Sequence, residues 1–265
     1  MLVDHDLHIH TVFSNCCGDS QQIPENIIKL ANESGLKKIG FSDHTWENNE
    51  LEPTEWYANQ GGGRINELAR TVRASAIESP RIFIGCEAET MSHGKFSISQ
   101  DFAATLDYVV LATDHFHFTD LVEQPSDYSP ATFGRHLLKM FRAGAVAPFK
   151  NIVLAHPCLP LGFMNLYEPM IDTISDSEFL DTFAVAAEHN VALEITLSFF
   201  PDAARNRNFS RSVPVRVLSL AKQAGCKFVF GSDAHSLVRL QRIHELDFFV
   251  QELALERTDI HPLAL

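Results

Sequence analysis

The feature that most constrains the fold of this chain is a recurring pattern: a short apolar run rich in β-branched residues, then a turn, then a helix-like stretch. The strand candidates cover residues 2–8, 37–42, 81–86, 107–112, 151–155, 191–195 and 227–231. The helix-like stretches cover residues 24–34, 63–79, 130–143, 177–189, 213–224 and 240–253. Gly35 and Gly225 directly follow two of these stretches, as helix C-caps do. Strands that alternate with helices in this way predict a mainly parallel sheet.

Such a sheet can stay open and doubly wound, or it can close into a barrel. No glycine-rich phosphate loop follows the first strand candidate, which disfavours the open sheet of nucleotide-binding proteins. The chain has 265 residues, is 45% hydrophobic and contains no linker-like stretch. We therefore predict a single domain over residues 1–265.

Histidines and carboxylates gather at the C-terminal ends of the strand candidates. These residues are His8, His10, Asp43, His44, Glu87, Glu89, Asp114, His115, His117, His156, Glu194, Asp233 and His235. In a parallel barrel all these strand ends open onto one face, where active sites are built. We therefore expect residues from both halves of the chain to converge there.

These residue types are ligands for divalent metal ions. Imidazole and carboxylate bind zinc, manganese and iron, and a bridging carboxylate holds two ions close together. His8 and His10 are two positions apart on an extended segment, so both rings point the same way. Each member alone has an ordinary structural explanation, such as a helix cap for Asp233 or a loop histidine bonded to backbone for His156. Because that explanation must hold independently at nearly every strand end, the sequence predicts a metal centre.

The same segments resemble the PHP family, named for polymerase and histidinol phosphatase. The resemblance rests on Asp6-Leu7-His8-Ile9-His10-Thr11, Ser42-Asp43-His44, Gly85-Cys86-Glu87, His115, Ala155-His156-Pro157 and Gly231-Ser232-Asp233-Ala234-His235. Leu193-Glu194-Ile195 and Ser198 are similar to the single-domain bacterial members. The motifs run in the family's order from about residue 3 to about residue 250. The resemblance implies a distorted seven-stranded (βα)7 TIM-like barrel, two or three divalent ions (zinc, manganese or iron) and phosphoester hydrolysis.

The resemblance also implies how the ligands are shared. His8, His10, Glu87 and Asp233 would hold one ion. Glu87 would bridge to a second ion, held also by His115 and His156. His44 and His235 would belong to the third ion. Glu87, Asp233 and His235 are then the expected catalytic residues.

One position departs from the family pattern. Many members have a histidine where this chain has Cys16, and some polymerase relatives have an aspartate at the position of Cys17. A thiolate is a good zinc ligand, so we expect Cys16 to complete the third site. The alternatives that remain open are a ligand role for Asp19, a weak or empty third site, and two small cysteines that only pack in a loop.

The expected mechanism uses the ions to lower the pKa of a bridging water and to neutralise the phosphoryl oxygens. The nucleophile is then a metal-activated hydroxide, and His235, Asp233 and His117 are candidates for the general acid. Arg205 or Arg207, in the loop after the sixth strand candidate, would bind the phosphate oxygens. A solvated loop is the alternative for these arginines.

Charge and loop composition narrow the substrate. The formal net charge of −13 repels polyanions and disfavours nucleic acid, so a small phosphorylated molecule is the expected partner. Two loops, residues 45–63 and 118–129, are expected to shape the choice of substrate. Their aromatic content suits a flat or apolar leaving group, and the alternative is that these residues form only a small core within the loops. Histidinol phosphate, a nucleotide or oligonucleotide end, and another small phosphoester remain open.

Two other classes of function are alternatives to a phosphoesterase. An amidohydrolase-like enzyme acting on a non-phosphate substrate also begins with His-x-His, but that class often has a bridging lysine, and no strand end here has one. A non-enzymatic, metal-stabilised partner module is disfavoured because nearly every ligand position is intact.

The sequence also bears on location. The N-terminal MLVDHDLHIHT lacks a basic segment followed by an apolar run, and no apolar run approaches the roughly 20 residues of a membrane span. The five cysteines are an odd number, which disfavours a disulfide framework. We expect a cytoplasmic protein without a membrane anchor.

Overall fold

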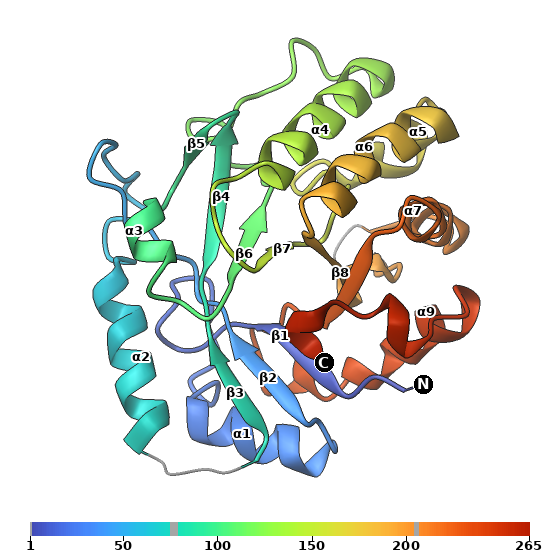
Figure 1. Cartoon of the computed structure of the whole chain (residues 1–265). Helices are drawn as coiled ribbons and strands as arrows, with labels where there is room; N and C mark the ends of the chain where they lie inside the picture. The colour runs from blue at the N-terminus through green and yellow to red at the C-terminus, as the bar shows by residue number, and fades with distance from the viewer. Residues whose placement is uncertain (1, 75–78, 204–206) are drawn as a thin grey trace.

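The strands form two sheets that face a common core, with the helices packed outside (Figure 1). The computed structural model describes residues 2–74, 79–203 and 207–265. The strands are β1 His5–Ile9, β2 Lys38–Phe41, β3 Arg81–Ile84, β4 Glu87–Ser92, β5 Lys95–Phe96, β6 Val109–Ala112, β7 Ile152–Leu154, β8 Ala192–Thr196 and β9 Lys227–Gly231. One sheet has the order β1-β2-β3, and the other has the order β5-β4-β6-β7-β8-β9. Among the described residues, every strand pair is parallel except the β4–β5 hairpin.

The two sheets are joined on both sides. On one side, β3 continues into β4 through Gly85 and Cys86, so one bent segment serves both sheets. On the other side, the backbone N–H of His10 donates to the carbonyl of Ala234 over 3.0 Å, and Asp6 accepts the N–H of Ser232 over 2.9 Å. The predicted α/β fold with parallel strands is confirmed, and seven strand positions result when β3 and β4 are counted as one and the antiparallel β5 is left out. The seam between β1 and β9 carries an isolated bridge in place of a ladder.

The strands have near-continuous buried runs because helices cover one side and the core fills the other. All residues of β1, β6, β7 and β8 are buried. Beneath the strands, the Tyr108 hydroxyl donates to the carbonyl of Leu7 over 2.9 Å. A Cβ at Gly40 would lie 2.2 Å from that hydroxyl, so only glycine allows the ring to cross there.

The longer helices agree with the predicted stretches. The helices are α1 Pro24–Glu33, α2 Gly62–Ala74, α3 Gln100–Ala103, α4 Pro130–Ala145, α5 Tyr167–Asp172, α6 Asp176–Glu188, α7 Ser212–Gln223, α8 Leu237–Leu240 and α9 Asp247–Glu252. Gly35 and Gly225 have φ of 72° and 88°, so both predicted C-caps are confirmed. The predicted helix over 63–79 is α2 as far as Ala74, and residues 75–78 lie outside the described part of the chain. None of the described helices has the length and apolar character of a membrane span.

The prediction of one helix over residues 240–253 is wrong. This segment contains the end of α8, a 3₁₀ turn at Ile243–Leu246 and the short α9. Its buried apolar residues recur every third position only as far as the end of the 3₁₀ turn, at Leu240, Ile243 and Leu246, and Phe249, Val250 and Leu253 follow in α9 and at its end. That spacing keeps one face buried in a 3₁₀ turn, whose period is three, and does not fit the 3.6-residue period of a long α-helix.

Gly231, the last residue of β9, allows a test of how tightly the barrel end is packed. A Cβ there would lie 1.9 Å from Oε1 of Glu194 and 2.8 Å from Cβ of His8. We expect Gly231→Ala to lower the free energy of unfolding by about 1–3 kcal/mol, as overpacking does, measured by urea denaturation. Gly63→Ala is the matched control because nothing lies within 4 Å of its added Cβ. Equal stability of the two variants would contradict the close packing described here.

Candidate metal centre

The C-terminal strand ends bring their histidines and carboxylates together into three groups. Within each group the ligand atoms all lie within 4.8 Å of one another. The groups are His8, His10 and Asp233; Glu87, His115 and His156; and His10, Cys16, His44 and His235. Every residue predicted as a metal ligand belongs to at least one group. The structure thus brings the predicted residues together, while their ligand roles stay predictions.

Glu87 lies between the groups and is 1% exposed. Its Oε2 lies 3.3 Å from Nε2 of His8 and 3.2 Å from Nε2 of His10. Its Oε1 lies 3.3 Å from Nε2 of His156 and 3.6 Å from Nε2 of His115. One carboxylate oxygen therefore faces each of two groups, which is the arrangement a bridging ligand needs.

Buried carboxylates orient the imidazole rings from behind. Nδ1 of His8 lies 2.9 Å from Glu194, Nδ1 of His156 lies 2.8 Å from Asp114, and Nδ1 of His115 lies 2.8 Å from Glu89. A ring that donates its Nδ1–H to a carboxylate presents the lone pair of Nε2, the form that binds metal. The sequence placed these carboxylates at strand ends but gave them no role.

Glu194 connects two ligands from different strands. Besides contacting His8, it accepts the backbone N–H of His156 over 2.5 Å. His156 has a φ of 30° and Asp233 a φ of 51°, values that non-glycine residues rarely adopt. Two proposed ligands thus sit on strained backbone, which is a property of functional sites.

The electrostatics suit exchange of protons for a cation. Burial disfavours the charged form of Glu87, but the nearby imidazoles of His44 and His8 hold the pKa of that carboxyl well below its usual range. Burial likewise disfavours charge on His8, yet Glu194 and Glu87 raise the pKa of His8 to about 10. The protein residues alone therefore place protonated imidazoles around a carboxylate. A divalent cation can replace that positive charge as the protons leave.

The two neighbouring cysteines have different surroundings. Sγ of Cys16 lies 3.6 Å from Nδ1 of His10, and Cys16 belongs to the third group. Burial opposes its ionisation, but the charge of His10 lowers the pKa of the Cys16 thiol to about 3. Sγ of Cys17 instead donates to the carbonyl of His235 over 3.3 Å, and burial raises the pKa of the Cys17 thiol to about 11. Asp19 is in none of the three groups found among the described residues, and its carboxylate accepts the N–H of Gln21.

The predicted arginines differ from the one that the structure places at the centre. Arg205 lies outside the described residues, and the backbone of Arg207 forms an isolated bridge with Asp202, so their phosphate-binding role stays a prediction. Arg239 was missed. Its buried guanidinium donates to the carbonyl of Asp233 over 2.9 Å and to Oγ of Ser198 over 2.9 Å. No sequence signal separates such a residue from the ordinary polar residues of a helix.

Several histidines away from the strand ends have structural partners. Four of them contact backbone carbonyls: His136 that of Glu123, His189 that of Val185, His244 that of Ser34, and His261 that of Asn190. His117, a candidate general acid, is in none of the three groups. Burial and the neighbouring His115 lower the pKa of His117 to about 4.

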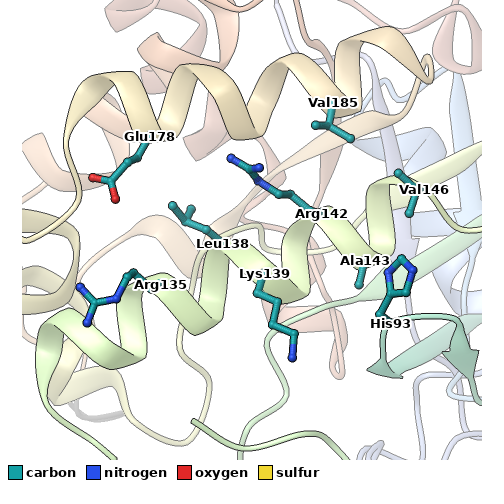
Figure 2. Close-up of a pocket in the computed structure, with 9 residues that line it drawn as sticks. All are labelled: His93, Arg135, Leu138, Lys139, Arg142, Ala143, Val146, Glu178 and Val185. Carbon is teal, nitrogen blue, oxygen red and sulfur yellow. The ribbon is translucent and has the colours of Figure 1, made fainter. Parts of the chain in front are cut away.

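A large cavity lies elsewhere, on the outside of the barrel between α4 and α6 (Figure 2). Its volume is about 630 Å³. It is lined by His93, Arg135, Leu138, Lys139, Arg142, Ala143, Val146, Glu178 and Val185. No member of the three groups lines this cavity, so we place the chemistry at the strand ends and not there.

Comparison with known proteins gives a family match, two relatives and a similar solved structure. A model of the PHP domain matches residues 6–196. The chain is 25% identical over 256 residues to a probable phosphatase of Vibrio atlanticus, covering 96% of this chain and 87% of the relative. It is 27% identical over 240 residues to a probable phosphatase of Caldicellulosiruptor saccharolyticus, covering 89% and 81%. A crystal structure of histidinol phosphate phosphatase from Lactococcus lactis, complexed with zinc, L-histidinol and phosphate, is similar in fold, with a TM-score of 0.61, 17% identity and coverage of 97% and 95%.

The contact between Glu194 and His8 can be tested without any substrate. We expect Glu194→Gln to weaken metal binding about 10–100-fold, because the neutral amide orients and polarises the ring less than a carboxylate does. The measurement is metal retention against a chelator of known affinity. Glu178→Gln, which alters only an exposed helix cap, is the matched control. Metal retention by Glu194→Gln equal to that of the control would remove the orienting role.

Proposed function

The chain belongs to the PHP domain family, and we propose that it is a metal-dependent phosphatase that hydrolyses a small phosphomonoester. The observation that carries this proposal is Glu87, whose two oxygens face different groups of histidines. The similarity to two probable phosphatases supports the reaction class. The acidic net charge of −13 supports a small substrate over a nucleic acid.

The residues present fit two or three divalent ions. His8, His10 and Asp233 would hold one ion together with Glu87, and His115 and His156 would hold a second with the same carboxylate. Imidazole and carboxylate donors suit zinc, manganese or iron. Cys16, His44 and His235 would hold a third ion, and the thiolate favours zinc at that place. When bound, the ions would lower the pKa of a water and neutralise charge on the phosphoryl oxygens.

Two proposed ligands near the solvent, Asp233 and His235, are suited to proton transfer. Asp233 and His235 have side chains that are 16% and 32% exposed, whereas His8 and His10 are fully buried. Nδ1 of His235 lies 3.5 Å from Oδ1 of Asp233, so the pair can hold and pass a proton at the mouth of the centre. The guanidinium of Arg239 donates to the backbone carbonyl of Asp233 and so holds this residue in position. We propose that His235 protonates the leaving oxygen when the third site holds no ion, because a ring nitrogen bound to that ion would have no proton to give.

The alternatives weighed on the sequence are less well supported. Glu87 occupies the place between the groups that a lysine often fills in amidohydrolase-like enzymes, which disfavours that class. The completeness of the three groups disfavours a non-enzymatic module. Histidinol phosphate is one candidate substrate, supported by a similarity in fold to an enzyme of that specificity.

The proposal is tested by metal analysis and phosphate release in the same preparations. We expect about two or three zinc, manganese or iron ions per chain and hydrolysis of at least one phosphomonoester in a broad panel. Glu87→Gln should lower kcat/KM more than about 100-fold, because removal of residues that only support ligands already costs about 10–100-fold. Glu245→Gln, an exposed pair with Arg242, is the control. Near wild-type metal content and activity in Glu87→Gln would mean that Glu87 is not the bridging ligand and that the proposed centre is wrong.

The third ion gives a separate test on the two cysteines. We expect Cys16→Ser to lose up to about one metal equivalent and to be stripped more easily by chelator, because a neutral hydroxyl replaces a thiolate. Cys16→His should restore the metal, since it reinstates an imidazole donor. Cys17→Ser is the matched control, because its sulfur contacts the His235 carbonyl and belongs to none of the groups. Full metal content in both serine variants would mean that neither sulfur is a ligand.

A further inference from the structure

Two loops from different strands meet beside the metal centre. The loop over residues 45–61 follows β2, and the loop over residues 116–129 follows β6. The rings of Trp56 and Phe118 lie 5.3 Å apart and join the two loops. His44 and His115 follow the ends of these strands, so both loops start directly after proposed metal ligands.

The rings of these loops also touch the ligands directly. Trp56 stands edge-on to His44, with ring centroids 5.1 Å apart. Phe118 stands edge-on to His115 at 5.8 Å, and the ring of His117 lies 5.1 Å from that of His115. A group resting against these rings is therefore one side chain away from the ions that would hold the phosphate.

The loops are anchored to the same carboxylate that orients a ligand. The hydroxyl of Tyr57 donates to Oε1 of Glu89 over 2.5 Å, and the same oxygen lies 2.8 Å from Nδ1 of His115. Tyr57 is buried, with Trp46 and Met91 packed against it. We call the rings of Trp56 and Phe118 the aromatic wall, and this anchoring fixes its position relative to the metal centre.

A cavity of about 570 Å³ lies against this wall, a size that suits a small ligand. It is lined by Thr54, Glu55, Trp56, His117, Phe118, Thr119, Asp120 and Leu121. The lining thus contains two carboxylates and no lysine or arginine. Carboxylates repel a second phosphate or carboxylate, while aromatic faces attract flat rings and cations.

We propose that Trp56, His117 and Phe118 form the subsite for the leaving group, and that this group is a planar ring without negative charge. The inference rests on the proposed phosphatase function and names its substrate class. In the reaction, the bond from phosphorus to the leaving oxygen breaks as a bond from phosphorus to a water oxygen forms. One proton of that water ends on the leaving alcohol, whose ring remains against the aromatic wall until release.

The subsite is tested by a ratio of two substrates. 2-Phenylethyl phosphate and 2-cyclohexylethyl phosphate have alcohols of similar acidity and size, so their kcat/KM ratio reports recognition of the flat ring. We expect a ratio of at least about 10 in the wild type, falling toward one in Trp56→Leu and Phe118→Leu, since aromatic pairing contributes about 0.5–1.5 kcal/mol per pair, or about 2–13-fold. Tyr128→Leu, whose ring stacks on Phe163 away from this cavity, is the control. A wild-type ratio near one, or a ratio kept in both variants, would overturn the inference.

The charge of the lining is tested with one further substrate. A carboxylate on the ring of 2-phenylethyl phosphate should lower kcat/KM at least about 5-fold, because it faces Glu55 and Asp120. The double change Glu55→Gln with Asp120→Asn should restore most of that loss. No effect of the added carboxylate, or no recovery in the double variant, would remove the role of these acids.

A binding measurement separates this inference from the proposed function. The chain has two tryptophans, so Trp46→Phe leaves Trp56 as the sole indole reporter. Adding 2-phenylethylamine to this metal-loaded variant should change Trp56 fluorescence saturably, and Phe118→Leu should weaken the response. If no phosphomonoester is hydrolysed but the response saturates, the phosphatase function fails and the aromatic subsite stands. If hydrolysis occurs without a fluorescence response, the subsite is wrong.

Discussion

The rest of this structure depends on the burial of one carboxylate, Glu87, among imidazole rings. Burial alone would neutralise this group, and only nearby positive charge keeps it ionised. The surrounding rings are themselves buried, and Glu194, Glu89 and Asp114 lie behind three of them, those of His8, His115 and His156 respectively. A parallel barrel meets this demand because all its strand ends face one way. The parallel fold and the site therefore depend on each other, because the fold brings together the charged groups that keep the buried Glu87 carboxylate ionised.

The proposed ligands could be predicted from the sequence because their positions follow from topology. Once seven strands are recognised as parallel, the residue after each strand must lie at the same end, wherever it falls in the chain. His156 is an example: it lies in a loop of no particular composition, yet β7 delivers it opposite Glu87. The membership of Cys16 in the third group could also be predicted, because Cys16 stands where many members of the PHP family have a histidine. Packing partners do not follow from such a rule.

What escaped prediction depends on distance in space without a sequence pattern. Arg239 is invisible in the sequence because its bonds to Ser198 and Asp233 exist only after β8 and β9 are side by side. The strand after Cys86 was missed because it contains the polar residues Glu87, Glu89 and Thr90, and Glu87 and Glu89 are buried against the histidines of the site. The break within residues 240–253 was missed because its apolar residues were assigned the period of an α-helix, although Leu240, Ile243 and Leu246 recur with the three-residue period of a 3₁₀ turn.

The weak seam between β1 and β9 has a consequence for how the protein is made. Of the described strands, β1 is synthesised first and β9 last, and the segments at their C-terminal ends are joined by an isolated bridge. His8 and His10 therefore meet Glu194 and Asp233 only after β8 and β9 have been synthesised. Ions bound by the proposed ligands would hold the ends of β1 and β9 together. A chain that ends before β9 lacks Asp233 and His235, so it cannot present all the proposed ligands.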